Sequence, residues 1–101
     1  MLEISRNILE HPRQFILMND IKFSILGSYI IKKEKKIFLT QTENKLLYFF
    51  CNNYDTRVYS YDIVEYLQNS TDKVVYTEQN IYVHINRIRK KLEIIHPNRK
   101  F

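Results

Sequence analysis

The chain has 101 residues, of which 45% are hydrophobic and 27% charged, and its net charge is +5. This length holds one domain with a modest core, and the apolar share is too high for a disordered chain. The single cysteine, Cys51, excludes an intramolecular disulfide, and three histidines without ligand spacing argue against a metal site or a cofactor.

The first thirteen residues carry the weakest pattern in the chain. The spacing of their apolar residues allows a short helix, which Pro12 would end. These apolar residues are Leu2, Ile4, Ile8 and Leu9. From Phe15 to Leu39 the pattern changes, and we expect a small antiparallel sheet of three or four strands there.

Short apolar runs and turn signals alternate within this sheet region. The run from Phe15 to Met18 ends at Asn19-Asp20, which is a turn signal. Residues 21 to 25 then alternate between apolar and polar side chains, which is the period of a half-buried strand. Gly27-Ser28 indicates the next turn.

The most strongly charged segment of the sheet region is the run from Lys32 to Lys36. It is flanked by the apolar runs Tyr29-Ile30-Ile31 and Ile37-Phe38-Leu39. This pattern predicts a hairpin with an exposed, basic tip. We expect the tip to be a solvated face, with an auxiliary phosphate contact as the alternative.

The helical half of the chain opens with a capping-box pattern from Thr40 to Glu43, a hydroxyl with a carboxylate three residues later. It predicts a helix that ends at Asn52-Asn53. The side chains predicted to be buried are Leu46, Leu47, Phe50 and Cys51. For Cys51 this means a small buried hydrophobic residue.

A second helix is predicted to begin after Ser60, which is a good N-cap residue. Its apolar positions are Ile63, Val64 and Leu67. The segment from Asn69 to Asp72 is polar and predicts a loop.

A third helix is predicted from Thr77, its cap, to about Ile95, because it must end before Pro97. Glu78 suits the helix dipole. One apolar stripe at helical spacing consists of Ile81, Ile85, Ile88 and Leu92. The opposite face carries Val83, Asn86, Arg87 and Lys90. Tyr82 and Arg89 flank the stripe on one side, His84 and Lys91 on the other.

The excess positive charge is concentrated at the end of the chain. Residues 77–101 hold six Lys/Arg and two Glu, whereas the other 76 residues hold ten Lys/Arg and nine Asp/Glu. Such an asymmetry indicates a phosphate-binding surface, and the alternative is a solvated basic face without a partner. Since no linker or repeat divides the sequence, we expect residues 1–101 to form one domain: a sheet over 15–39 and three helices over 40–95, the last about 78–95.

Three segments of the helical half form recognisable motifs. Leu39 to Leu47 read LTQTENKLL, Val58 to Val64 read VYSYDIV, and Asn80 to Leu92 read NIYVHINRIRKKL. They resemble the LT-xx-E-xx-LL, V-x-S-xx-x-L and VxVHIxRLRKKL signatures of the DNA-binding domain in OmpR/PhoB-type bacterial regulators. The resemblance spans about Phe15 to Phe101 and implies an α+β winged helix-turn-helix with an N-terminal antiparallel sheet. Because no phosphoacceptor receiver domain precedes the motifs, we expect the ToxR/CadC-like branch.

The resemblance implies a sequence-specific DNA-binding domain of a transcriptional regulator, with its third helix in the major groove of promoter DNA. Implied base contacts are Tyr82, Val83, Asn86 and Arg87, of which helical geometry alone selects the last three. Implied phosphate contacts are His84, Arg89 and Lys90. The loop implied to meet RNA polymerase or flanking DNA runs from Asn69 to Tyr76, and its candidate contact residues are Asn69, Ser70, Thr71, Asp72 and Lys73. A homodimer on DNA is a further expectation.

The sequence departs from the family pattern at two places. The family commonly carries an acidic residue where Tyr82 stands, so the base preference of the family is not transferred to this chain. The family also ends in a wing hairpin with a T-x-x-G-x-G-Y signature, and this chain ends at Arg99-Lys100-Phe101 instead. We therefore expect the C-terminal wing to be missing or truncated, with fewer phosphate contacts and a flatter salt dependence.

The competing hypothesis is a wingless winged-helix module that binds and modulates a partner regulator. Many tyrosines support it, because tyrosine is enriched at interfaces. They are Tyr48, Tyr54, Tyr59, Tyr61, Tyr66, Tyr76 and Tyr82. For His84 a structural role is as strong an expectation as a phosphate contact, and Val83 is either an inert exposed residue or a contact to a thymine methyl.

We expect no enzymatic activity and no catalytic residues. The sequence shows no nucleophile-base pair, no glycine-rich phosphate loop and no metal constellation. Glu43, Asp62 and Glu78 have helix-capping or helix-dipole explanations. No apolar run reaches the roughly 18 residues of a membrane span, so we expect no membrane segment in this chain. We expect a cytoplasmic, nucleoid-associated location, and the alternative is the cytoplasmic part of a membrane-anchored regulator.

Overall fold

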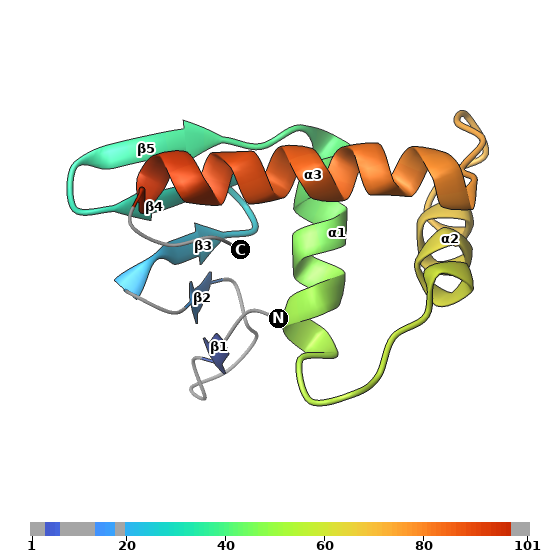
Figure 1. The fold of residues 1–101 in the computed structure, drawn as a ribbon, viewed down its shortest axis with the longest axis horizontal. Helices are drawn as coiled ribbons and strands as arrows, with labels where there is room; N and C mark the ends of the chain where they lie inside the picture. Colours follow the sequence, from blue (N-terminus) through green and yellow to red (C-terminus); the bar gives the residue numbers. More distant parts are fainter. Residues whose placement is uncertain (1–3, 7–13, 18–19, 98–101) are drawn as a thin grey trace.

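The computed structural model describes residues 4–6, 14–17 and 20–97. Within these ranges an antiparallel sheet is followed by three helices, and the longest helix crosses the molecule from the second helix to the sheet (Figure 1). The strands are β1 Ile4–Arg6, β2 Gln14–Leu17, β3 Lys22–Ser24, β4 Tyr29–Lys32 and β5 Lys35–Phe38. The helices are α1 Gln41–Asn52, α2 Ser60–Asn69 and α3 Glu78–Ile95. The predicted α+β order is confirmed.

The sheet is a meander in which each strand pairs with its neighbour in the chain, in the order β1-β2-β3-β4-β5 for the described residues. Alternate side chains of β2 to β4 enter the core, which is the pattern predicted for half-buried strands. The buried ones are Phe15, Leu17, Phe23 and Ile30. Four strands lie in the predicted region, and β1 adds a fifth at its edge.

The N-terminal helix prediction is wrong for the described part of that segment. Ile4 to Arg6 form a strand that pairs with β2, with Ile4 opposite Leu17 and Arg6 opposite Phe15. Pairing with β2 satisfies backbone hydrogen-bonding groups of both strands, whereas a one-turn helix would leave those of β2 unpaired. Residues 1–3 and 7–13, including Pro12, lie outside the described residues.

The predicted Gly27-Ser28 turn and the β4–β5 hairpin are confirmed, whereas Asn19 of the predicted Asn19-Asp20 turn lies outside the described residues. Ser28 takes the left-handed conformation in the turn before β4, with a φ of 56°, and Lys33 does so at the hairpin tip, with a φ of 55°. The strands extend into the charged run, so that Lys32 and Lys35 pair across the hairpin. The tip is therefore shorter than the sequence pattern indicated.

The predicted capping box of α1 is confirmed. The Thr40 hydroxyl accepts the Glu43 N–H at 3.2 Å, and the Thr40 N–H donates to Glu43 Oε1 at 2.9 Å. The helix ends at Asn52, as predicted. Leu46, Leu47 and Cys51 are fully buried, and Phe50 packs against them with part of its ring exposed.

The prediction that Ser60 caps α2 is wrong by one residue. Tyr59 is the N-cap, and its N–H donates to Asp62 Oδ2 at 2.9 Å. The Ser60 hydroxyl donates instead to Glu78 Oε1 at 2.7 Å, so it ties the start of α2 to the start of α3. Asn69 belongs to α2, so the polar loop begins one residue later than predicted.

Helix α3 begins after Thr77 and ends at Ile95, as predicted, with Thr77 and Asn80 forming its capping box. It packs against α1 and α2 and, toward its C-terminal end, against β4 and β5 (Figure 1). Its apolar stripe joins the core formed by the sheet and the other two helices. None of the helices within the described ranges is long and apolar enough to span a membrane.

Candidate nucleic-acid interface

The outer face of α3, formed by Val83, Asn86, Arg87 and Lys90, is exposed to solvent over all four residues. Opposite it, Ile81, Ile88 and Leu92 are buried and Ile85 is half-buried against the core. An α-helix has 3.6 residues per turn, and this repeat places the two sets of residues on opposite faces of α3. The helical periodicity of the sequence therefore located both faces correctly.

The flanking residues differ between the two sides of the helix. Tyr82, with 53% of its surface exposed, and the exposed Arg89 extend the outer face on one side. His84 and Lys91, on the other side, are only partly exposed. Six of the seven predicted contact residues on α3 thus lie on one continuous exposed surface, and His84 lies at its edge.

His84 sits in a partly buried environment. Its ring meets the Tyr76 ring edge-on, with the centroids 6.5 Å apart, and its Nδ1 atom is buried without a partner among the described residues. Burial lowers the pKa of His84, the positive charge of Arg87 lowers it further, and the Glu43 carboxylate opposes both. A neutral imidazole offers a phosphate at most one N–H donor rather than a full charge.

Lys91 does not belong to the exposed surface. Its Nζ lies 2.5 Å from Glu43 Oε1 and donates to the Phe38 carbonyl oxygen at 3.0 Å. The sequence interpretation explained Glu43 by helix capping alone and missed this ion pair. The available signal was the place of Lys91 beside the apolar stripe, since a lysine that is partly buried needs a partner.

The β4–β5 hairpin meets the C-terminal end of α3. Lys32 Nζ lies 2.5 Å from His96 Nδ1, and Lys35 Nζ donates to the Ile94 carbonyl oxygen at 3.2 Å. The expectation of a wholly solvated tip is therefore wrong for these two lysines, because the end of α3 offers Lys35 an unpaired carbonyl group and Lys32 the ring nitrogen of His96. Lys36 points to the other face of the sheet, with its Nζ 4.2 Å from the Tyr29 ring centroid.

The loop between α2 and α3 is fixed by the Gln68 side chain. Its Nε2 donates to the carbonyl oxygens of Thr71 and Val74, and its Oε1 accepts the Tyr76 N–H. Tyr76 itself is buried, with its hydroxyl 3.1 Å from Thr42 Oγ1. The sequence gave no periodic signal for this arrangement, because Gln68 falls on the polar side of α2.

The predicted partner residues differ in how they are held. Asn69 ends α2, the Ser70 hydroxyl donates to the Leu67 carbonyl and accepts a hydrogen bond from Lys45, and Thr71 is half-buried. Ser70 is exposed despite these hydrogen bonds, and the other exposed loop residues are Asp72, Lys73, Val74 and Val75. Val74 and Val75 lie within the predicted loop but were not named among its contact residues, and 76% of the surface of Val75 is exposed.

Two aromatic residues at the start of α2 were also not predicted as a unit. The exposed rings of Tyr59 and Tyr61 stack with their centroids 5.5 Å apart and an interplanar angle of 3°. They lie next to Ser60, whose hydroxyl bonds Glu78 at the start of α3. The pair thus sits at the junction of the two helices.

A comparison with protein families supplies the identity of this domain. A family model described as "Transcriptional regulatory protein, C terminal" matches residues 34–100, a range that includes β5 and all three helices. No curated protein and no solved structure gave a significant match. The predicted wing loss concerns residues from Arg99 onward, which lie outside the described residues, and the ToxR/CadC-like branch stays a prediction. The matched range and the α+β order of helices after an antiparallel sheet place the chain in the family of OmpR/PhoB-type winged-helix DNA-binding domains of transcriptional regulators.

Proposed function

We propose that this domain recognises specific DNA sequences by inserting the outer face of α3 into the major groove. The observation that carries the proposal is the pairing of an exposed polar, cationic face with a buried apolar stripe on one helix of 18 residues. The major groove of B-DNA admits a helix of this kind, and its base edges present a distinct pattern for each base pair. Family membership supplies the DNA-binding role and leaves the contact residues to be assigned.

Each residue of the outer face has a contact that suits its chemistry. Arg87 can donate two hydrogen bonds to a guanine, and Asn86 can pair with the edge of an adenine. Tyr82 and Val83 offer apolar surface to thymine methyl groups, and the Tyr82 hydroxyl adds a hydrogen bond. A bidentate pair contributes about 1–3 kcal/mol of discrimination against a wrong base.

Phosphate contacts are assigned to Arg89 and Lys90, whose side chains are exposed beside the base-reading residues. Such contacts position the helix without reading sequence. His84 is the weakest of the predicted phosphate contacts, because burial favours its neutral form. The exposed loop residues Asp72 and Lys73 are proposed to meet RNA polymerase, and two domains are proposed to bind DNA together as a homodimer.

Fluorescence anisotropy tests the proposal with labelled duplexes, one AT-rich and promoter-like and one of random sequence, at two salt concentrations. Arg87→Ala should weaken binding to a cognate duplex by about 5- to 150-fold, which is 1–3 kcal/mol. Lys90→Ala should weaken binding to all duplexes equally and reduce the slope of log affinity against log salt by about 0.9.

Lys22→Ala is the matched control. Lys22 is exposed on β3, so this substitution removes one positive charge at a position outside α3. If Arg87→Ala binds like Lys22→Ala, α3 does not read DNA. A folded chain that binds no duplex even at low salt would favour the competing function, a module that binds a partner regulator.

A further inference from the structure

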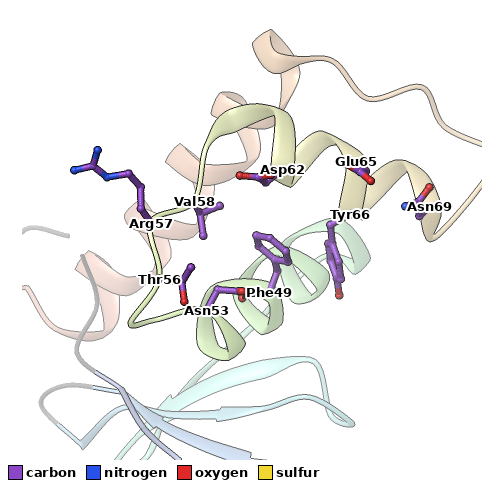
Figure 2. Close-up of a pocket in the computed structure, with 9 residues that line it drawn as sticks. All are labelled: Phe49, Asn53, Thr56, Arg57, Val58, Asp62, Glu65, Tyr66 and Asn69. Carbon is purple, nitrogen blue, oxygen red and sulfur yellow. Dashed lines mark hydrogen bonds between the residues drawn. The ribbon is translucent and has the colours of Figure 1, made fainter.

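A groove of about 440 Å³ lies between the C-terminal part of α1 and the side of α2 (Figure 2). The apolar and aromatic residues of its lining are Phe49, Val58 and Tyr66, and the other lining residues are polar or charged. The Phe49 and Tyr66 rings lie close together, with their centroids 4.6 Å apart. Burial raises the pKa of Tyr66, and the neighbouring Tyr48 adds to the effect, so the phenol stays protonated at neutral pH.

The groove opens on the side of α2 that faces away from α3. Ser60 and Gln68 mark the side of α2 that bonds to α3 and to the loop before it. Each residue turns a helix by about 100°, which puts Asp62 and Tyr66 on the opposite side. A ligand in the groove would therefore leave the outer face of α3 uncovered.

The rim of the groove carries negative charge in a chain whose net charge is +5. Asp62, Glu65 and Arg57 all line it, but the guanidinium of Arg57 points away from the other lining residues (Figure 2). Asp62 uses one carboxylate oxygen to accept the Tyr59 N–H. Glu65 is exposed and makes no ion pair within the described part of the chain.

We propose that this groove is a docking site for a protein segment that presents an arginine or lysine beside an apolar side chain. The cation would meet the Glu65 carboxylate and lie against the Tyr66 ring, the charge of Asp62 would add to the attraction, and the apolar side chain would cover Phe49 and Val58. Both contacts use chemistry that the groove already displays, since aromatic faces and carboxylates attract the same cations. Nucleic acid would be repelled by the two carboxylates.

A second copy of the chain is the less suitable occupant. Among the described residues, two exposed basic segments could serve as its ligand: the outer face of α3, which the proposed function assigns to DNA, and the β4–β5 hairpin, which lies at the other end of the molecule from α2 (Figure 1). A contact between opposite ends is heterologous and builds rings or open-ended arrays rather than a two-fold symmetric dimer. Chains of net charge +5 would also repel each other in solution.

The test is NMR titration of the ¹⁵N-labelled chain with a blocked hexapeptide that alternates arginine and leucine. We expect shifts clustered on the amides of Phe49, Val58, Glu65 and Tyr66, and no such cluster with a peptide in which glutamine replaces arginine. Glu65→Gln should weaken peptide binding at least fivefold. Glu34→Gln is the matched control, because it removes the same charge from the exposed hairpin tip.

The proposal is overturned if the glutamine peptide binds equally well, if Glu65→Gln behaves like Glu34→Gln, or if the shifts fall elsewhere. Shifts in the groove that grow with protein concentration and without peptide would make a second copy the occupant and overturn it as well. Measuring both duplex binding and peptide binding of the same variants distinguishes this proposal from the proposal that α3 reads DNA. Glu65→Gln should leave duplex binding within twofold of the unmodified chain, whereas Arg87→Ala should leave peptide binding unchanged.

Discussion

Lys91 of α3 and Glu43 of α1 form an ion pair in which the carboxylate is almost fully buried, with 1% of the Glu43 side chain exposed. Burial alone would raise the pKa of Glu43, but hydrogen bonds from Lys91 and Thr40 outweigh it and hold that pKa below its ordinary value. The same oxygen accepts the Thr40 N–H of the capping box. The Glu43 carboxylate thus takes part in the N-terminal capping box of α1 and also binds α3 through Lys91.

Lys91→Met should destabilise the domain by about 3 kcal/mol, because it leaves the buried Glu43 carboxylate without its counter-charge. This is the low end for a buried pair, since 25% of the Lys91 side chain is exposed. The double variant Lys91→Met/Glu43→Gln should recover part of the loss. Denaturant unfolding measures both, with Lys90→Met as the control, because Lys90 is exposed and should change stability by less than about 0.5 kcal/mol. A loss for Lys91→Met as small as that of the control would contradict the prediction.

The two helix starts should respond differently to loss of a hydroxyl. Thr77→Ala removes the side-chain cap of α3 and should cost about 1 kcal/mol. Ser60→Ala removes only an exposed hydrogen bond to Glu78 and should cost less, about 0.5 kcal/mol. Urea midpoints at unchanged m-value give the comparison. Equal losses would mean that Ser60 does act as the cap of α2.

The lowered pKa of His84 predicts a stability change on mild acidification. Below pH 6.5 the unfolded chain protonates this histidine, whereas the folded chain does so only at lower pH. The unfolded state then binds more protons, so the free energy of unfolding falls as pH drops from 6.5 to the pKa in the folded state. His84→Asn should flatten this slope, and His96→Asn, measured in parallel, should not remove it. Glu43 acts separately, below pH 4.5, because its pKa is lowered from that value.

Lys35 and Lys36 offer a test of how the hairpin supports α3. Lys35→Ala removes the hydrogen bond to the Ile94 carbonyl and should speed amide hydrogen exchange in the last turn of α3. Lys36→Ala should leave exchange there unchanged, because Lys36 lies over Tyr29 on the other face of the sheet. The two variants remove the same charge from adjacent positions. Similar exchange rates in both would show that the Lys35 contact does not hold the helix end.

Local patterns predicted most of the helical half. Thr40 and Thr77 were identified as caps because a capping hydroxyl bonds an N–H only three residues away, and the outer face of α3 follows from periodicity within one helix. Strand β1 was missed because its stability comes from pairing with β2, which its own three residues do not encode. Ser60 was assigned wrongly because its hydroxyl bonds Glu78, 18 positions along the chain.

The candidate site was predictable to the same extent and for the same reason. The exposure of Arg87 and Asn86 could be inferred from the helix alone. The burial of His84 depends on the Tyr76 ring, which the loop brings to it, and the role of Lys91 depends on Glu43, 48 positions away. Pairings of this kind have no local pattern, so only the folded chain shows them.

The three hydrogen bonds of Gln68 have a consequence for how this domain could change over time. They fix the path of the α2–α3 loop from a side chain outside it, through backbone groups of Thr71, Val74 and Tyr76. Backbone groups are present whatever the side chain, so Asp72 and Lys73 can be exchanged without altering the course of the loop. The shape of this segment is thus separated from its chemistry, and a new partner could be acquired by substitution at two exposed positions with the scaffold unchanged.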